Sequence, residues 1–240
     1  MILPRRPQNR RSTPSVPTSR HRHRGRGAVL SQSRKLDLTA KKLQGLGLQR
    51  GTRARIISQV ETSPAGISRV LISQDQIAQR VAEMGRQITS DLSGEEPLFI
   101  CILRGAAIFH ADLVRAVKLN LKIDFISVSS YGAATHSSGQ VQLIKDLESS
   151  IEKQHVILVE DIVDTGLTAT YLLRNLTSRN PRSVRFCSLL SKPARREVEI
   201  EPDYLGFEIP DEFVVGYGLD FNQKFRNLPF IGVFDADELD

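Results

Sequence analysis

The chain has 240 residues, of which 40% are hydrophobic, enough for one well-packed domain and a small subdomain. No apolar run approaches the length of about 20 residues that a membrane-spanning helix needs. The net charge of +6 is concentrated at the start, because residues 1–36 hold nine Arg, one Lys and no acid. The rest of the chain carries 23 basic and 27 acidic residues, so its folded part is not predicted to bind nucleic acid.

Residues 1–65 are predicted to form a disordered, Arg-rich tail. Four prolines interrupt its beginning, the stretch HRHRGRG is low in complexity, and no hydrophobic period is sustained. Such a segment cannot bury enough apolar surface to offset its ordering entropy. Three interpretations stay open: a solvated tail or a mistakenly included upstream start, an organelle transit peptide, and a polybasic arm for nucleic acid. The prolines argue against the amphipathic helix of a mitochondrial signal.

Residues 66–240 are predicted to form one domain of alternating strands and helices. Ser73 and Gln76 have the spacing of a capping box, and apolar residues follow at helical spacing as far as Leu92. Further on, apolar runs predict strands at 98–103, 123–129, 156–159 and 184–190, with helices around 109–117 and 171–176. This alternation indicates an α/β fold with a doubly wound, mainly parallel sheet.

Two cysteines fall inside the predicted strands. Cys101 and Cys187 are therefore expected to be buried free thiols, which fits a reducing compartment such as the cytoplasm.

Polar residues gather where the predicted strands end. Arg104-Gly105, Ser130-Tyr131, Glu160–Thr168 and Lys192 all occupy such positions. Because ligands of open parallel sheets bind at the carboxyl ends of the strands, these residues are predicted to share one site.

The segment from His155 to Thr168, HVILVEDIVDTGLT, is the most informative part of the chain. An apolar run ends in three carboxylates and a Thr-Gly-Leu-Thr turn that enters a helix. The helix start offers unpaired N–H groups and the positive end of a dipole, and the glycine lets an anion approach closely. Carboxylates repel phosphate, so they are predicted to hold hydroxyls, a divalent metal or a proton.

This segment resembles the phosphoribosyl-pyrophosphate (PRPP) signature of the type I phosphoribosyltransferases. Residues 191–232 resemble the purine-binding and closing segment of bacterial-type hypoxanthine-guanine phosphoribosyltransferases, and the whole resemblance spans about residues 67–235. It implies the type I fold with a small hood subdomain, and a homodimer or homotetramer. It also implies purine salvage, in which PRPP and hypoxanthine or guanine give IMP or GMP and pyrophosphate.

The resemblance implies a role for each matching residue. Asp164 matches the general base beside purine N7, and Ser130 and Tyr131 match the mobile lid over the reaction. The PRPP contacts would be Glu160 and Asp161 at the ribose, Thr165, Gly166, Leu167 and Thr168 at the 5′-phosphate, and Leu103, Arg104, Gly105 and Arg226 at the pyrophosphate. In the family the loop at residues 103–105 often contains a cis peptide bond that does not involve proline.

The resemblance also implies a purine site and a magnesium site. Lys192 would donate to the 6-oxo group, Phe213 would stack on the base, and the Val214 carbonyl would accept from the ring edge. Mg²⁺ would lie against Glu160, Asp161 and Asp220. Taken alone, Lys192 is typical of a solvated strand end, Phe213 of core packing and Arg226 of an ordinary surface.

Two other functions stay open. The first is a phosphoribosyltransferase for another base such as xanthine, because a lysine at O6 does not decide which group occupies the 2-position. The second is a PRPP-fold regulator that binds RNA, which the charge of the folded part argues against. No membrane partner is expected, and nucleic acid could bind only through the tail.

Overall fold

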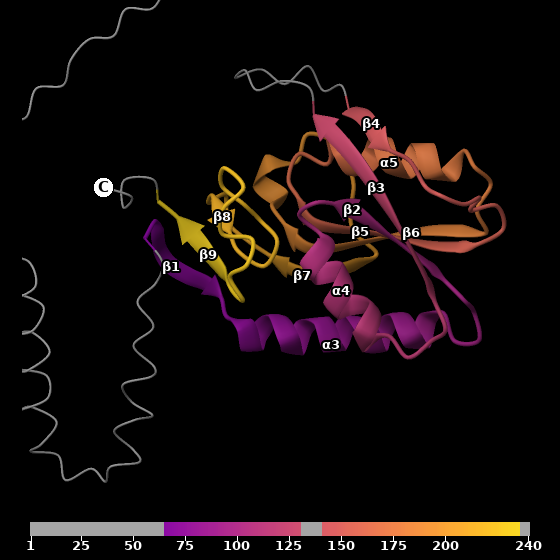
Figure 1. The fold of residues 1–240 in the computed structure, drawn as a ribbon, viewed down its shortest axis with the longest axis horizontal. Coiled ribbons are helices and arrows are strands. Elements are labelled where there is room, and N and C mark those ends of the chain that lie inside the picture. The colour runs from indigo at the N-terminus through magenta and orange to yellow at the C-terminus, as the bar shows by residue number, and fades with distance from the viewer. Residues whose placement is uncertain (1–64, 131–140, 236–240) are drawn as a thin grey trace, which may run out of the picture. The chain divides into compact units, whose positions relative to one another are not determined.

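The computed structural model describes residues 65–130 and 141–235 (Figure 1). The predicted tail, except for residue 65, and Tyr131 of the predicted lid lie outside these residues. The main sheet has six strands in the order β4-β3-β2-β5-β6-β7. Their bounds are β2 Leu98–Leu103, β3 Lys122–Ser130, β4 Val141–Lys145, β5 His155–Val163, β6 Ser183–Ser191 and β7 Tyr204–Glu208.

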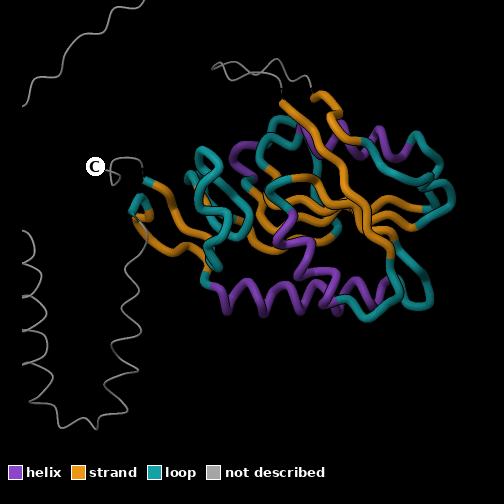
Figure 2. Tube along the Cα trace, in the orientation of Figure 1, coloured by secondary structure: helices purple, strands orange, loops and turns teal. Residues whose placement is uncertain are grey.

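The main sheet is mainly parallel, as the alternating pattern predicts. The pairs β2–β3, β2–β5, β5–β6 and β6–β7 are parallel, and only the edge strand β4 runs antiparallel to its neighbour β3. The carboxyl ends of β2, β3, β5 and β6 therefore meet at one edge of the sheet. Figure 2 shows the strands of this sheet in orange, lying side by side.

Helices cover both faces of this sheet. The helices α3 (Gln74–Asp91) and α4 (Ala107–Ala116) pack on one face, and α5 (Leu167–Thr177) packs on the other (Figure 1). Neighbouring residues of β5 divide between the two cores: Ile157 and Val159 face α3 and α4, whereas Val156 and Leu158 face α5. Burial on both faces explains why this strand is a continuous apolar run.

Helix α3 begins where the sequence predicts. The Ser73 hydroxyl accepts from the backbone N–H of Gln76, and the Gln76 side chain accepts from the Ser73 N–H, which completes the capping box. The helix then buries the predicted apolar stripe against the sheet.

Strand β5 is longer than the sequence predicts. The apolar run was expected to end before the acids, but β5 continues to Val163 because β6 keeps pairing with it. Glu160 lies opposite Ser188, and Val163 lies opposite Ser191. Glu160 and Asp161 are therefore held by the sheet itself, and only Asp164 follows the strand.

A second, three-stranded sheet forms the hood. It has the order β1-β9-β8, with β1 Ile67–Ile72, β8 Val214–Val215 and β9 Ile231–Phe234, all antiparallel. Ile67, Val215 and Phe234 form its small core, together with partly buried Phe221 and Phe225. These strands are too short for an alternating pattern, and β1 finds its partner at the other end of the chain, so periodicity alone does not predict them.

Both cysteines are buried and unpaired, as expected. Burial raises the pKa of the Cys101 thiol to about 12 and shifts the pKa of Cys187 in the same direction, so both are unreactive thiols. Among the described residues, no helix combines the length and the hydrophobicity that crossing a bilayer requires.

Candidate active site

Two neighbouring acids of β5 lie at the edge where the strands end. Glu160 is only 8% exposed, and its Oε2 is buried without a hydrogen-bond partner among the described residues. Burial, and to a smaller extent the charge of Asp161, raise the pKa of Glu160 well above its usual value. A buried carboxylate with an unused oxygen costs free energy unless a cation or a donor reaches it, so this position is suited to binding a ligand.

Asp161 lies directly beneath the loop that follows β2. A Cβ on Gly105 would lie 1.8 Å from Asp161 Oδ2, so any side chain here would displace the Asp161 carboxylate. Burial is the main cause that raises the pKa of Asp161 to about 6. The charge of Asp220 adds to this increase, whereas backbone N–H groups and Arg226 oppose it. The acids of β5 and Asp220 therefore share one negatively charged region.

The raised pKa of Asp161 predicts a pH-dependent stability. With a folded pKa of about 6 and an unfolded pKa of about 3.9, the folded chain binds more protons in between, so its stability increases as pH falls through this window. We expect Asp161→Asn to remove this contribution. In metal-free buffer, the free energy of unfolding of the variant, relative to that of the parent chain, should increase by about 1–2 kcal/mol as the pH rises from 5 to 7. Urea unfolding of both proteins at each pH measures this difference. Parallel pH profiles for the two proteins would contradict this assignment.

The turn after β5 forms a small cradle. Gly166 is the N-cap of α5 with φ of +85°, and a Cβ there would lie 2.6 Å from Ile200 Cγ2. The hollow has a volume of about 80 Å³ and is lined by residues of β5, the turn and the first turn of α5: Glu160, Ile162, Val163, Asp164, Thr165, Gly166, Thr168 and Ala169. Leu167 contributes its backbone N–H to this turn, where Thr165 Oγ1 accepts it at 3.4 Å. The helix start supplies the further N–H groups that an anion needs.

A chain of four charged groups joins Asp164 to Lys192. Asp164 Oδ1 lies 2.7 Å from Arg195 Nε, and Arg195 Nη1 lies 3.6 Å from Asp211 Oδ1. Asp211 Oδ1 in turn lies 3.8 Å from Lys192 Nζ. The ion pair leaves Asp164 Oδ1 without a well-aligned hydrogen bond among the described residues, so this carboxylate is held by charge and keeps its lone pairs available.

The residues predicted to bind purine divide between a buried and an exposed position. Lys192 is only 7% exposed, so it is not the solvated strand end that its position before Pro193 would suggest. Phe213 is 53% exposed and is therefore not a core residue either. Its ring packs edge-to-face on Phe221, with the centroids 6.0 Å apart. Val214, the first residue of β8, is buried directly after it.

The loop at residues 103–105 and the hood meet at two glycines. The Leu103–Arg104 peptide bond is cis, as the resemblance implies. Arg104 Nη1 donates to Gln223 Oε1 of the hood at 3.0 Å. Gly218 has φ of +107°, and a Cβ on it would lie 2.1 Å from the Gly105 carbonyl oxygen. The two backbones therefore touch, and no side chain fits between them.

Asp220 and Arg226 are partners in the hood. Arg226 Nη2 lies 2.6 Å from Asp220 Oδ1, and Arg226 Nη1 donates to the Gly218 carbonyl at 2.6 Å. The Arg226 side chain is one-quarter exposed, so it is more constrained than an ordinary surface arginine. The pair lies against the touching backbones of Gly105 and Gly218.

The structure leaves the predicted lid unplaced. Ser130 ends β3 at the expected sheet edge, and Tyr131 lies outside the described residues. Sequence reasoning missed four side chains of this region: Arg195, Arg196, Asp211 and Gln223. The sequence offers a signal for the first two, because Arg195 and Arg196 are adjacent and follow Lys192 at the predicted strand end by only three and four residues.

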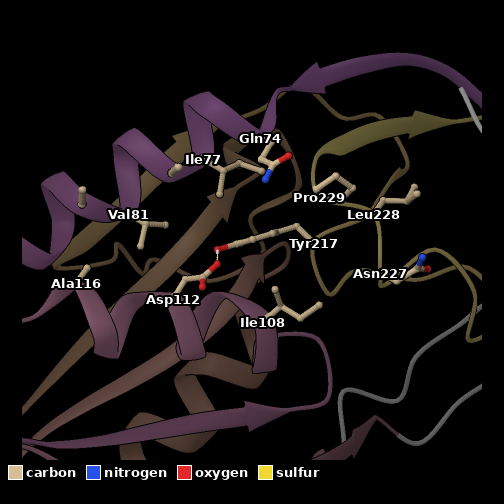
Figure 3. A pocket seen from close by; sticks show the side chains of 12 residues that line it. Gln74, Ile77, Val81, Ile108, Asp112, Ala116, Tyr217, Asn227, Leu228 and Pro229 are labelled. Carbon is tan, nitrogen blue, oxygen red and sulfur yellow. Dashed lines mark hydrogen bonds between the residues drawn. The ribbon is translucent and has the colours of Figure 1, made fainter. Parts of the chain in front are cut away.

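A separate hollow lies away from these groups (Figure 3). It has a volume of about 420 Å³, lies between α3, α4 and the hood segment, and contains none of the predicted site residues. At its wall the Tyr217 hydroxyl donates to Asp112 Oδ2 at 2.6 Å, which ties the hood to α4.

The comparisons with known proteins agree with this geometry. The family model for the phosphoribosyl transferase domain matches residues 72–222. The hypoxanthine-guanine phosphoribosyltransferase of Mycobacterium tuberculosis is 47% identical over 181 residues, which cover 73% of this chain and 90% of that protein. The chain belongs to the hypoxanthine-guanine phosphoribosyltransferase family.

Other relatives of this phosphoribosyltransferase extend the comparison. The "Bifunctional protein TilS/HprT" of Listeria monocytogenes is 47% identical over 183 residues, but the chain spans only 28% of its length. The structure of a hypoxanthine phosphoribosyltransferase from Staphylococcus aureus superposes with a TM-score of 0.71 at 43% identity, covering 74% of this chain and 98% of that one. The Trypanosoma cruzi enzyme in complex with its product IMP superposes with a TM-score of 0.68 at 37% identity, covering 73% and 98%.

Proposed function

We propose that this chain transfers the 5-phosphoribosyl group from PRPP to hypoxanthine or guanine, giving IMP or GMP and pyrophosphate in purine salvage. The observation that carries the proposal is the buried Lys192 ammonium at the end of β6, joined by charge to Asp164 beside the phosphate cradle. A buried cation at O6 favours an oxo-purine and repels the 6-amino group of adenine. Asp164 then faces the ring nitrogen that loses its proton.

The proposed reaction displaces pyrophosphate at ribose C1 by a purine nitrogen. The turn at Thr165–Thr168 binds the 5′-phosphate through backbone N–H groups at the start of α5. Asp164 accepts the proton released from the purine. Arg104 and Arg226 bind the pyrophosphate, and Ser130 and Tyr131 belong to the lid that excludes water from the reacting sugar.

The acids of β5 fit a divalent cation. Glu160 has an unused buried oxygen, and burial, with a small addition from the charge of Asp220, raises the pKa of Asp161, so a cation would stabilise both charged carboxylates. The described residues hold no group of three or more His, Cys, Asp or Glu side chains arranged to bind a metal alone. Mg²⁺ commonly uses one or two carboxylates and completes its shell with substrate oxygens, so Glu160 and Asp161, with Asp220 across the site, would hold it. When bound, it neutralises charge on the leaving pyrophosphate.

The test of this function is turnover of PRPP with four bases. Hypoxanthine, guanine, xanthine and adenine are compared with and without Mg²⁺, on the full chain and on a chain that begins near residue 60. We expect Mg²⁺-dependent turnover of hypoxanthine and guanine by both proteins and none with adenine. A clear preference for xanthine would mean that the acceptor base is xanthine and not hypoxanthine or guanine. PRPP binding without turnover of any base would favour a regulator over an enzyme.

Lys192→Ala tests the acceptor assignment directly. Removing a charge-assisted hydrogen bond of about 1.5–3 kcal/mol should raise the KM for hypoxanthine and guanine about 10–100-fold. The KM for PRPP should stay close to the parent value. Lys153→Ala is the control, because that side chain is 86% exposed and outside the site. An unchanged KM for both purines would remove Lys192 from the base site.

We also propose domain bounds, a cellular location and an oligomeric state for this chain. Residues 66–240 form the phosphoribosyltransferase domain, residues 1–65 are a tail that catalysis does not need, and the enzyme acts in the cytoplasm as a homodimer or homotetramer. Two buried free thiols support a reducing compartment. Size-exclusion chromatography with light scattering tests the assembly.

A further inference from the structure

Arg196 connects the ends of the neighbouring strands β5 and β6. Its Nη1 donates to the carbonyl oxygens of Val163 at 3.1 Å and Asp164 at 2.5 Å, both at the exit of β5. Its Nη2 donates to Ser191 Oγ, at the exit of β6, at 2.8 Å. The side chain is partly buried, and its Cδ packs against Gly166 in the turn at Thr165–Thr168, called the phosphate turn below.

The backbone around Asp164 is held on both sides. The Val163 carbonyl also accepts from the Lys192 N–H at 3.0 Å, and the Thr165 carbonyl accepts from the Glu197 N–H at 3.0 Å. Arg196 alone reaches the carbonyl of Asp164 itself among the hydrogen bonds of the described residues. Since β5 ends at Val163, the sheet cannot supply this donor.

We propose that Arg196 is a positioning residue that sets the Asp164 carboxylate and the phosphate turn through their backbone. The inference rests on the proposed function, because Asp164 and the turn are the groups that would act there. One planar guanidinium holds three acceptors at once in a fixed geometry, whereas the three N–H donors of an ammonium radiate from a single nitrogen and lack this planar arrangement. A displacement of about 1 Å in such a group can cost about 10²-fold in rate.

The test is steady-state kinetics of Arg196→Met and Arg196→Lys with PRPP and hypoxanthine. We expect Arg196→Met to lower kcat about 10²-fold and to raise the KM for PRPP about tenfold, with the KM for hypoxanthine changed less than about threefold. Arg196→Lys keeps the positive charge but loses the planar arrangement of N–H donors. Its kcat and its KM for PRPP should therefore lie between those of Arg196→Met and those of the parent chain. If Arg196→Met does not fold, Arg196→Lys carries the test by the same split between kcat and the two KM values.

The matched control is Arg179→Met. Arg179 also donates three hydrogen bonds, to Asp146 and Asn175, but it follows the far end of α5. It should lose thermal stability and keep the parent kinetics. The inference is overturned if Arg196 variants lose only stability, or if Arg179→Met lowers kcat equally. An inactive parent chain would instead contradict the proposed function.

Discussion

Asp164→Asn is expected to lower kcat about 10²–10⁴-fold while PRPP affinity stays near the parent value. Asparagine has almost the same shape as aspartate but cannot accept a proton from the purine. Asp164 follows the last residue of β5, and its Oδ1 lies 2.7 Å from Arg195 Nε, so the carboxylate has a defined position at the site. Pre-steady-state turnover measures the chemical step, and calorimetry with PRPP measures binding.

Asp211→Asn is the control for Asp164→Asn. Asp211 is the other carboxylate beside Arg195, at 3.6 Å from Nη1, and it is half exposed. Because it lies farther from the phosphate cradle, its loss should cost less than about tenfold in kcat. Turnover of Asp164→Asn at the parent rate would remove Asp164 from the role of general base.

Gly218→Ala is expected to lower kcat/KM for PRPP by about 10²-fold or more. The new Cβ would lie 2.1 Å from the Gly105 carbonyl oxygen, and neither backbone can yield as a flexible side chain would. The hood must then move away from the loop at residues 103–105, which separates Arg226 from Arg104. Initial rates at varied PRPP concentration measure the loss.

Gly94→Ala separates this clash from backbone strain. Gly94 has φ of +84°, yet nothing lies within 4 Å of the Cβ that alanine would add. It should lose about 1–2 kcal/mol of stability from the left-handed backbone and keep the parent kinetics. Equal kinetic losses in the two variants would mean that strain, and not contact between the loops, causes the effect.

Local signals predict much of the fold. The capping box at Ser73 and Gln76 places the start of α3, and the apolar run at Leu98–Leu103 gives the bounds of β2. The turn at Thr165–Thr168 predicts an anion site because strand, glycine and helix start are adjacent in the chain. Each of these features depends only on residues that are close in the sequence, so a local sequence pattern is enough to predict it.

Other features depend on residues far apart in the chain. Lys192 looks solvated from its neighbours, but the fold buries it. The length of β5 depends on how far β6 accompanies it, which composition does not reveal. In the sequence Arg196 is one of many polar residues, and only the fold brings its three acceptors within hydrogen-bond distance. The hood needs β1 and β9, whose pairing no short window of sequence can contain.

The pairing of β1 with β9 has a consequence for the newly synthesised protein. The strand order places β9 between β1 and β8, with Ile67 opposite Phe234. The hood therefore cannot close until β9 has left the ribosome, even when the strands of the main sheet are already available. Chains released early, before Ile231, would lack the central strand of the hood and leave both of its neighbours with an unpaired edge. The hood, and with it the proposed purine site, therefore forms only in a chain that has been synthesised through Phe234.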